Sequence, residues 1–480
     1  MPFNKVILGL AAASIVNSDA RGTISPHTTN TRGARKSILS ELTTNFRRGH
    51  EEDFLRELES DLRPIYVTMQ KNEHGSVGFA QARYAIHRLF VEQHGWTIAG
   101  LEPWGDSAES SSAPSDALMK WMPRYLVNAI EQLMGTHGVS LRELAVLAAT
   151  LQDLIHKEAA GRLEELYDML ELPTSGRIGA ADSEKVITYY TAMYTSGGNT
   201  TVRTVQDIAE RKAGLDRRTV AWLNDVRHQI MERESQCDAA SGECEKLDFP
   251  SATRVVEEIG EKYGPFNDGL CQDLKSTLMR SEDGHTGLVP LSDFYSEGVK
   301  GSWNFSETTT YLRELGALDE AKMSVIIPNY VSSRPNCLTA STIYMVCCRN
   351  ECEGKLAHLE KKLSTSSAVP SRIIELIEPL LAPQNLSQIL IDSLDVVASE
   401  NDGWVSVHSK DFASWMHQVF PRECPRPHAP GSSMGPQTAD EWLKEDSAKH
   451  DASIVSKEEL NEVHHPSDGV DEVEHEALMV

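Results

Sequence analysis

Apolar residues recur at helical spacing through most of the chain between residues 48 and 424. In HEEDFLRELESDLRPIYVTM, a spacing of three or four residues places on one helix face Phe54, Leu55, Leu58 and Leu62. Later stretches such as TRVVEEIGEKYG, CQDLKSTLMR, STIYMVCCRNECEGKLAHLEKKL and IIELIEPLLAP have the same helical texture. Short β-prone runs, VIIPNYV (325–331) and WVSVH (404–408), occur only in connections. The pattern therefore predicts an all-α fold with at most a few two-stranded contacts.

The clearest helix start is the tetrapeptide SLRE at residues 140–143. The Ser140 hydroxyl can cap the backbone while the Glu143 carboxylate reaches back, which is the reciprocal arrangement of a capping box. The helix that follows, LAVLAATLQDLI, is apolar almost all round and is expected to be buried. Further along, Asp153 and His156 share a face and Glu158 lies off it. We therefore expect a surface hydrogen bond between Asp153 and His156 rather than a metal or acid–base cluster.

Composition divides the chain of 480 residues, which is too long for one ordinary core, into segments with different expected structures. The predicted segments are a signal peptide at 1–20, a flexible leader at 21–47, a cysteine-free helical domain at 48–235, a polar connector at 236–250, a cysteine-rich helical domain at 251–424 and an acidic tail at 425–480. The tail has too little apolar surface to offset the entropy of ordering, so we expect it to be disordered.

The first residues have the pattern of a secretory signal peptide. Lys5 precedes an apolar run from Val6 to Val16, and Ser18 and Ala20 place small residues at the −3 and −1 positions of a cleavage site. The run is too short to cross a bilayer comfortably, and no later segment approaches a spanning length. We expect cleavage after Ala20, no membrane span, and a mature protein that is secreted or lies in the endomembrane lumen.

The cysteines, an even number in a chain expected to be secreted, predict disulfide bonds whose pairing the sequence leaves open. They are Cys237, Cys244, Cys271, Cys337, Cys347, Cys348, Cys352 and Cys424. The first two bracket a polar loop, CDAASGEC, that could close on itself. A thiolate zinc site in CCRNEC (347–352) is the alternative, but zinc sites usually have two spaced cysteine pairs, so structural disulfides are favoured. N-x-S/T sequons mark glycosylation candidates at Asn199, Asn304 and Asn385.

The formal net charge of −25 limits the classes of partner. A strongly acidic chain is repelled by phosphate backbones and by anionic lipid surfaces, so nucleic acid and membrane are not expected as main partners. Another protein is the partner that the charge leaves open. Acidity is also compatible with cation binding.

The segment SEDGHTGLVPLSDF has the shape of a calcium-binding loop between two helical stretches. An EF-hand loop has oxygen ligands at positions 1, 3, 5, 7, 9 and 12 and a glycine at the sharp turn in position 6. Placing Gly287 at position 6 makes 282–293 the loop. Its ligand candidates for Ca²⁺ are Glu282, Thr286, the carbonyl of Leu288, and Asp293.

The resemblance to an EF-hand is closer in shape than in chemistry. Gly284 at position 3 has no side chain, position 9 is Pro290, and position 12 is an aspartate rather than the bidentate glutamate. Fewer ligand charges imply weak binding, toward a Kd of ~10⁻⁴–10⁻³ M. The Gly-x-Val/Ile turn recurs in helix–loop–helix context at 70–81, 171–182 and 398–409.

EF-hands normally occur in pairs that join through the residue at position 8, so the resemblance implies contacts between such loops. Within the two predicted domains these would be Val77 with Ile178 and Val289 with Val405, although the spacings are wider than in tandem EF-hands. The chain also resembles large secreted EF-hand-like proteins of unicellular algae and related protists. The stretches that carry this resemblance are KNEHGSVGFAQARYAIHRLF, LAVLAATLQDLIHKE, MVCCRNECEG and FPRECPRPH.

Enzyme motifs are not supported by the sequence. It has no P-loop, no HExxH and no GxGxxG after a strand, and GSSMG (431–435) lies in a proline-rich segment rather than at a strand-to-helix turn. We therefore expect a secreted, non-enzymatic protein that binds calcium weakly and has a structural or interaction role. The alternatives are a helical interaction or scaffold protein without metal and, third, an enzyme of unidentified class.

Overall fold

The computed structural model describes residues 51–101, 137–195, 204–213, 217–234, 247–300, 305–381 and 385–428, together with single positions 122, 126, 130 and 215. The predicted signal peptide and leader, Cys237 and Cys244, Asn199 and Asn304, the GSSMG motif, and the tail beyond residue 428 lie outside these ranges. Asn385 is exposed. The described chain is all-α with short strands, which confirms the predicted fold class.

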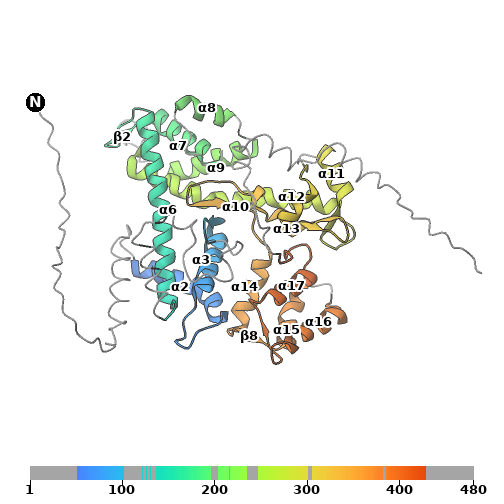
Figure 1. Ribbon diagram of the computed structural model, residues 1–480. Helices are drawn as coiled ribbons and strands as arrows, with labels where there is room; N and C mark the ends of the chain where they lie inside the picture. The colour runs from blue at the N-terminus through green and yellow to red at the C-terminus, as the bar shows by residue number, and fades with distance from the viewer. Residues whose placement is uncertain are drawn as a thin grey trace, which may run out of the picture.

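Within the described residues, helices dominate and the strands are short (Figure 1). The helices are α2 (Glu51–Thr68), α3 (Phe79–His94), α6 (Leu141–Met169), α7 (Ala180–Thr195), α8 (Val205–Ala213), α9 (Arg217–Glu234), α10 (Phe249–Arg280), α11 (Leu291–Lys300), α12 (Thr309–Glu314), α13 (Ile327–Val331), α14 (Cys352–Leu363), α15 (Pro370–Leu381), α16 (Gln388–Ser399) and α17 (Lys410–Val419). Among the described residues, no helix combines the length and the apolarity needed to cross a membrane.

The strands are β1 (Trp96–Ile98), β2 (Arg177–Ile178), β3 (Leu247–Asp248), β4 (Leu288–Pro290), β5 (Leu318–Asp319), β6 (Ser324–Ile326), β7 (Tyr344–Val346), β8 (Ser367–Ala368) and β9 (Val405–Ser406). They form antiparallel contacts in the orders β1–β7, β2–β3, β4–β6–β5 and β8–β9. The β4–β6–β5 sheet has one strand more than the predicted two-stranded contacts.

The helix α6 begins as predicted. The Glu143 backbone N–H donates to the Ser140 hydroxyl, and the Glu143 carboxylate accepts from the Ser140 backbone N–H at 2.8 Å. Every residue from Leu144 to Gln152 is buried, because α2, α7 and α10 pack around this helix. Its buried side chains belong to the largest hydrophobic cluster of the described chain.

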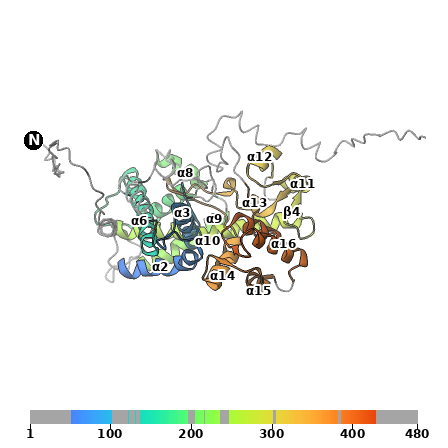
Figure 2. The same ribbon diagram turned by 60° about the horizontal axis from the view of Figure 1, so that its bottom comes forward.

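The long helix α10 runs from the part of the molecule formed by α6, α7 and α9 to the part formed by α11–α13 (Figures 1 and 2). It contributes residues to two hydrophobic clusters. Val255 and Ile259 in its first half belong to the largest cluster, whereas Leu274 and Leu278 in its second half belong to a second cluster around α11–α13. A third cluster fills the unit formed by α14–α17. The largest cluster takes residues from both sides of the predicted connector at 236–250, and the domain boundary stays a prediction.

One helix prediction is wrong at its start. STIYMVCCRNECEG was expected to be helical, but Tyr344–Val346 form β7 and pair with Trp96–Ile98, and α14 begins only at Cys352. Burial of all three β7 residues against β1 outweighs local helix propensity.

Disulfides hold the second half of the chain, as predicted. The bonds are Cys271–Cys348, Cys337–Cys347 and Cys352–Cys424. All the described cysteines are paired, so none of those in CCRNEC is available as a zinc thiolate. The bonds are compatible with an oxidising, secreted environment.

Candidate functional site

Each Gly-x-Val/Ile turn pairs with a second loop in a short antiparallel contact. Val77 pairs with Val139, Ile178 with Leu247, Val289 with Val325, and Val405 with Ala368. The predicted pairs, Val77 with Ile178 and Val289 with Val405, are therefore wrong. The partner is always a loop nearer in sequence, because the helices of neighbouring units must pack together and bring their own connecting loops side by side.

Sequence reasoning missed these partner loops because they lack the Gly-x-Val/Ile string. A different signal marks two of them, since the paired residue stands directly before a polar residue whose side chain caps a helix. Val139 precedes the Ser140 cap and Leu247 precedes the Asp248 cap, whereas Ile326, after Val325, makes no side-chain cap hydrogen bond. The described residues thus contain four such pairs of helix–loop units, and we call the pair built on Val289 and Val325 the third pair.

The glycine of each turn is required by backbone conformation. Gly75, Gly176, Gly287 and Gly403 have positive φ angles of 72, 81, 72 and 86°. Residues with a Cβ are strained in this left-handed region, whereas glycine is not. The predicted turn geometry is confirmed at these four positions.

Within the loop 282–293, the first and sixth positions are joined by a hydrogen bond. The Gly287 N–H donates to Glu282 Oε1 at 2.6 Å, and the Glu282 side chain is 1% exposed. The Thr286 hydroxyl donates to the Asp283 carbonyl at 2.7 Å, and the Leu288 carbonyl accepts from the Asp283 N–H at 3.0 Å. Asp293 lies exposed in the first turn of α11.

Arg422 holds the Glu282 carboxylate from the other side. Its Nε lies 3.0 Å from Oε1 and 2.8 Å from Oε2, and its Nη2 lies 2.5 Å from Oε2. The hydrogen bonds with Glu282 raise the pKa of Arg422, so the guanidinium stays charged. A two-pronged arginine contact of this kind is among the strong charge-assisted hydrogen bonds. The one fully buried carboxylate of the loop is therefore already neutralised by the protein.

The residues present do not fit a calcium ion in this arrangement. Calcium takes six to eight oxygen ligands, but Glu282 is bound by a guanidinium, the Leu288 carbonyl accepts a backbone N–H, and Asp293 faces solvent. Position 3, Gly284, has only its carbonyl, which lies 3.5 Å from Arg422 Nη2. Calcium binding by this loop stays a prediction for experiment.

The other turns offer even fewer ligands. In the loop at 70–81, the Asn72 side chain accepts from the backbone N–H groups of His74 and Ser76, both at 3.0 Å. In the loop at 398–409, Glu400 and Asp402 are exposed. Across the part of the chain that the structure describes, no group of three or more His, Cys, Asp or Glu side chains could hold a metal ion.

The predicted contact between Asp153 and His156 on α6 is wrong. His156 Nε2 lies 3.2 Å from Glu261 on α10, and Asp153 pairs with Lys157 at 2.5 Å. Glu158 accepts from the Thr342 N–H at 3.0 Å. Packing of α10 against α6 brings a carboxylate to the buried histidine, so a tertiary partner replaces the local one.

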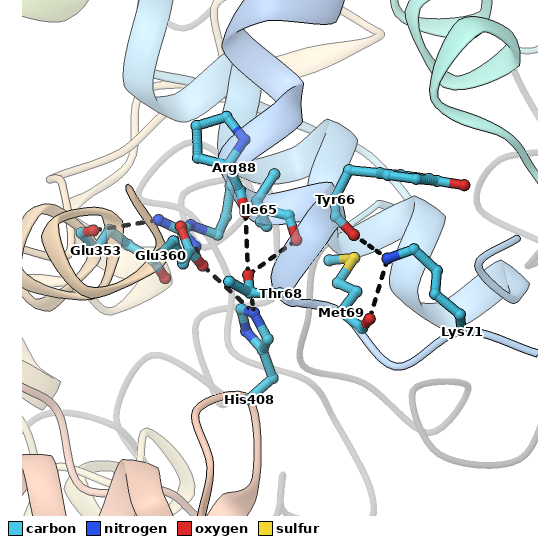
Figure 3. A network of polar contacts seen from close by, with 10 residues as sticks. Ile65, Tyr66, Thr68, Met69, Lys71, Arg88, Glu353, Glu360 and His408 are labelled. Carbon is cyan, nitrogen blue, oxygen red and sulfur yellow. Dashed lines mark hydrogen bonds and ion pairs between the residues drawn. The ribbon is translucent and has the colours of Figure 1, made fainter. Parts of the chain in front are cut away.

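A second polar cluster, shown in Figure 3, is buried where α2 and α3 meet the α14–α17 unit. The Arg88 guanidinium on α3 donates to Glu360 on α14 at 2.5 Å and is also paired with Glu353. His408, in the loop after β9, places its Nε2 3.4 Å from Glu360 and 3.1 Å from the Thr68 hydroxyl. We call these five residues the Arg88 network.

Burial shapes the titration of the Arg88 network. It raises the pKa of Glu360 to about 7, although Arg88 acts in the opposite direction, and it also raises the pKa of Glu353. The pKa of His408 is lowered to about 3 by burial and by the nearby Arg88 and Lys71. One guanidinium balances one carboxylate, so the second carboxylate keeps a proton more readily than it would in water. The network joins two parts of the chain that are far apart in sequence.

Comparisons with known proteins identify no relative: no family model, no curated protein and no solved structure matches this chain.

Proposed function

We propose that this chain is a secreted, non-enzymatic interaction or scaffold protein whose paired helix–loop units are held by protein contacts and need no calcium. The observation that carries this proposal is the contact between Arg422 and Glu282. A guanidinium occupies the most buried carboxylate of the only loop with several predicted ligands. A calcium ion could use Glu282 only after displacing that guanidinium.

The disulfide bonds of the chain support the proposal that the protein is secreted. The disulfides Cys271–Cys348 and Cys352–Cys424 close long loops, with sequence separations of 77 and 72. Such bonds persist outside the cytosol and are rare inside it. They can supply the fixed geometry that calcium supplies in metal-dependent modules.

Calcium titration tests the proposal. Isothermal titration of the purified protein and melting curves in 10 mM CaCl₂ and in EDTA are the measurements. A site with a Kd of ~0.1 mM would gain about 2.7 kcal/mol at 100 times its Kd, which would raise the melting temperature by several degrees. We expect no binding heat and no shift.

The alternative, a weak calcium-binding protein, predicts the opposite result, and two variants locate any signal. If calcium raises the melting temperature of the unmodified protein and Asp293→Ala removes the effect, the loop 282–293 is a calcium site and the proposal is wrong. If Asp293→Ala leaves the effect unchanged, calcium binds elsewhere and the proposal is equally wrong.

A further inference from the structure

Residues 421–428, which we call the strap, leave the α14–α17 unit and cross the third pair. The strap begins with a turn in which the Cys424 N–H donates to the Phe420 carbonyl at 2.8 Å, and it continues without helix or strand. Cys424 ties it to Cys352 on α14. The predicted disordered tail was to begin at residue 425, but residues 425–428 have defined contacts with the third pair.

Two arginines of the strap, four residues apart, each meet a carboxylate of the third pair. Arg422 binds Glu282 in the first loop. Arg426 lies 3.0 Å from Asp319 in β5 and donates to the Leu318 carbonyl at 3.1 Å. Both carboxylates are largely buried, with side-chain exposures of 1% and 15%. The third pair therefore recognises two positive charges at a fixed separation.

Asn329 adds a contact that does not depend on the strap's side chains. Its Nδ2 donates to the Arg426 carbonyl and its Oδ1 accepts from the Arg426 N–H, both at 2.8 Å. Asn329 is 4% exposed with the strap in place, and Arg426 satisfies both ends of its amide. A buried amide that satisfies both backbone groups of one residue fixes the register of the chain that crosses it.

Glycines open space for the strap on both loops of the third pair. A Cβ at Gly287 would lie 2.0 Å from the Pro421 carbonyl oxygen, and a Cβ at Gly316 would lie 2.2 Å from the His428 ring. Any side chain at these positions would push the strap away. The two glycines, the two carboxylates and Asn329 together form a surface shaped for this segment.

The strap residues on either side of Cys424 can leave this surface without opening a hydrophobic core, whereas Cys424 stays buried in the α14–α17 unit and bonded to Cys352. Apart from Cys424, no residue of the strap belongs to a hydrophobic cluster of the described chain. Its contacts with the third pair are mainly ion pairs and hydrogen bonds, which a segment of the same chemistry can replace.

We propose that the surface formed by Glu282, Asp319, Asn329, Gly287 and Gly316 is a recognition site for a peptide segment with arginines at positions i and i+4, and that the strap occupies it as a built-in ligand. The inference deepens the proposed interaction role and rests on it. The partner is a protein with an exposed, proline- and arginine-containing segment like PRECPRPH. The strap then competes with the partner and keeps the site closed until the partner's local concentration is high.

The test uses the full chain and a labelled synthetic peptide of residues 420–428 that carries Cys424→Ser. Fluorescence anisotropy measures its binding to the unmodified protein, to the Arg422→Gln/Arg426→Gln variant with a weakened strap, and to a matched Arg56→Gln/Arg372→Gln control. The control arginines lie in exposed local ion pairs and carry the same charge change. We expect the strap variant to bind the peptide at least tenfold more tightly than the other two proteins.

A second peptide with glutamine in place of both arginines should show no such gain. If the folded strap variant binds the two peptides equally, or binds neither, the strap contact is only packing and the inference is wrong. If the strap variant does not fold, hydrogen exchange of the unmodified protein decides instead. Millimolar arginine peptide should then speed exchange in residues 421–428, and an effect equal to that of the glutamine peptide would overturn the inference.

Failure of this inference and failure of the proposed function are distinguishable. Calcium titration reports on the metal independence of the loops and does not involve the peptide. Peptide binding by a protein that also binds calcium would overturn only the metal-free part of the proposed function.

Discussion

The guanidinium of Arg88 lies 2.5 Å from the Glu360 carboxylate, and this contact joins helices α3 and α14 across 272 residues of sequence. Their side chains are 5% and 2% exposed. Removing one member of a buried pair leaves the other charge without a partner, which costs about 3–5 kcal/mol. We predict that Arg88→Met lowers the free energy of unfolding by this amount in urea denaturation.

The matched control for Arg88→Met is Arg56→Met. Arg56 pairs with Asp53 at 2.6 Å, but both side chains are mostly exposed. Exposed pairs contribute about 0–1 kcal/mol. Equal losses in the two variants would show that the Arg88 network does not join the two parts of the chain.

The Arg88 network also predicts a pH dependence with a definite sign. The pKa of Glu360 is about 7 in the folded protein, above its usual value of 4.5. Between these values the folded state holds a proton that the unfolded state releases. Its contribution to stability is therefore complete below pH 4.5 and is lost as the pH rises through 7, a change of about 3 kcal/mol.

Glu360→Gln isolates this effect, because an amide does not titrate. We predict that the unfolding free energy of the unmodified protein falls relative to that of Glu360→Gln as the pH rises from 4.5 to 7. Above pH 8 the difference between the two should be constant. Other groups near Glu360 are Glu353, Glu92 and His408, and their effects on the difference are expected to be smaller. A difference that does not vary with pH would contradict the prediction.

Buried histidines have the opposite effect on stability: they lower the free energy of unfolding as the pH falls. Burial lowers the pKa of His87 and His408 to about 3 and that of His94 to about 4, below the usual 6.5. The unfolded state takes up these protons first, so stability falls as the pH drops from 6.5 toward 4. His87→Gln should weaken that fall by about 3–4 kcal/mol when unfolding is measured in urea from pH 7 to 4.

Local features of this fold follow from the sequence, and long-range features do not. The capping box of Ser140 and Glu143 depends on residues three apart, and its partners are fixed once the helix forms. The turn at Gly287 likewise depends on one residue whose backbone has a positive φ. These features could be predicted because neighbouring residues determine them.

Contacts between residues far apart in sequence determine the partners of the candidate site residues. Arg422 is 140 residues from Glu282, and its position depends on how the α14–α17 unit packs on the third pair. Nothing near Glu282 in sequence indicates that a guanidinium will bind it, so sequence reasoning assigned the carboxylate to calcium. The strand β7 was missed for the same reason, since its pairing with Trp96 is tertiary.

Gly287 combines a left-handed backbone with close contact to the strap, and substitution tests both. Alanine there would be strained at a φ of 72° and would place its Cβ 2.0 Å from the Pro421 carbonyl oxygen. We predict that Gly287→Ala destabilises the protein by about 2 kcal/mol or more. Gly269→Ala, on an exposed helical position of α10 with open space around it, should instead stabilise by about 0.5–1 kcal/mol.

The bond between Cys352 and Cys424 anchors the strap that brings Arg422 to Glu282. It closes a sequence separation of 72 residues, so chain entropy predicts a loss of about 4 kcal/mol on replacing both cysteines with serine. The same replacement at Cys337 and Cys347, ten residues apart, should cost about 3 kcal/mol.

The two variants should differ more clearly in hydrogen exchange than in stability. Cys352→Ser/Cys424→Ser should speed hydrogen exchange at residues 281–290, because the strap that covers these residues loses its anchor. Cys337→Ser/Cys347→Ser should not change exchange there. Equal exchange at 281–290 in the two variants would mean that the ion pairs hold the strap without the disulfide.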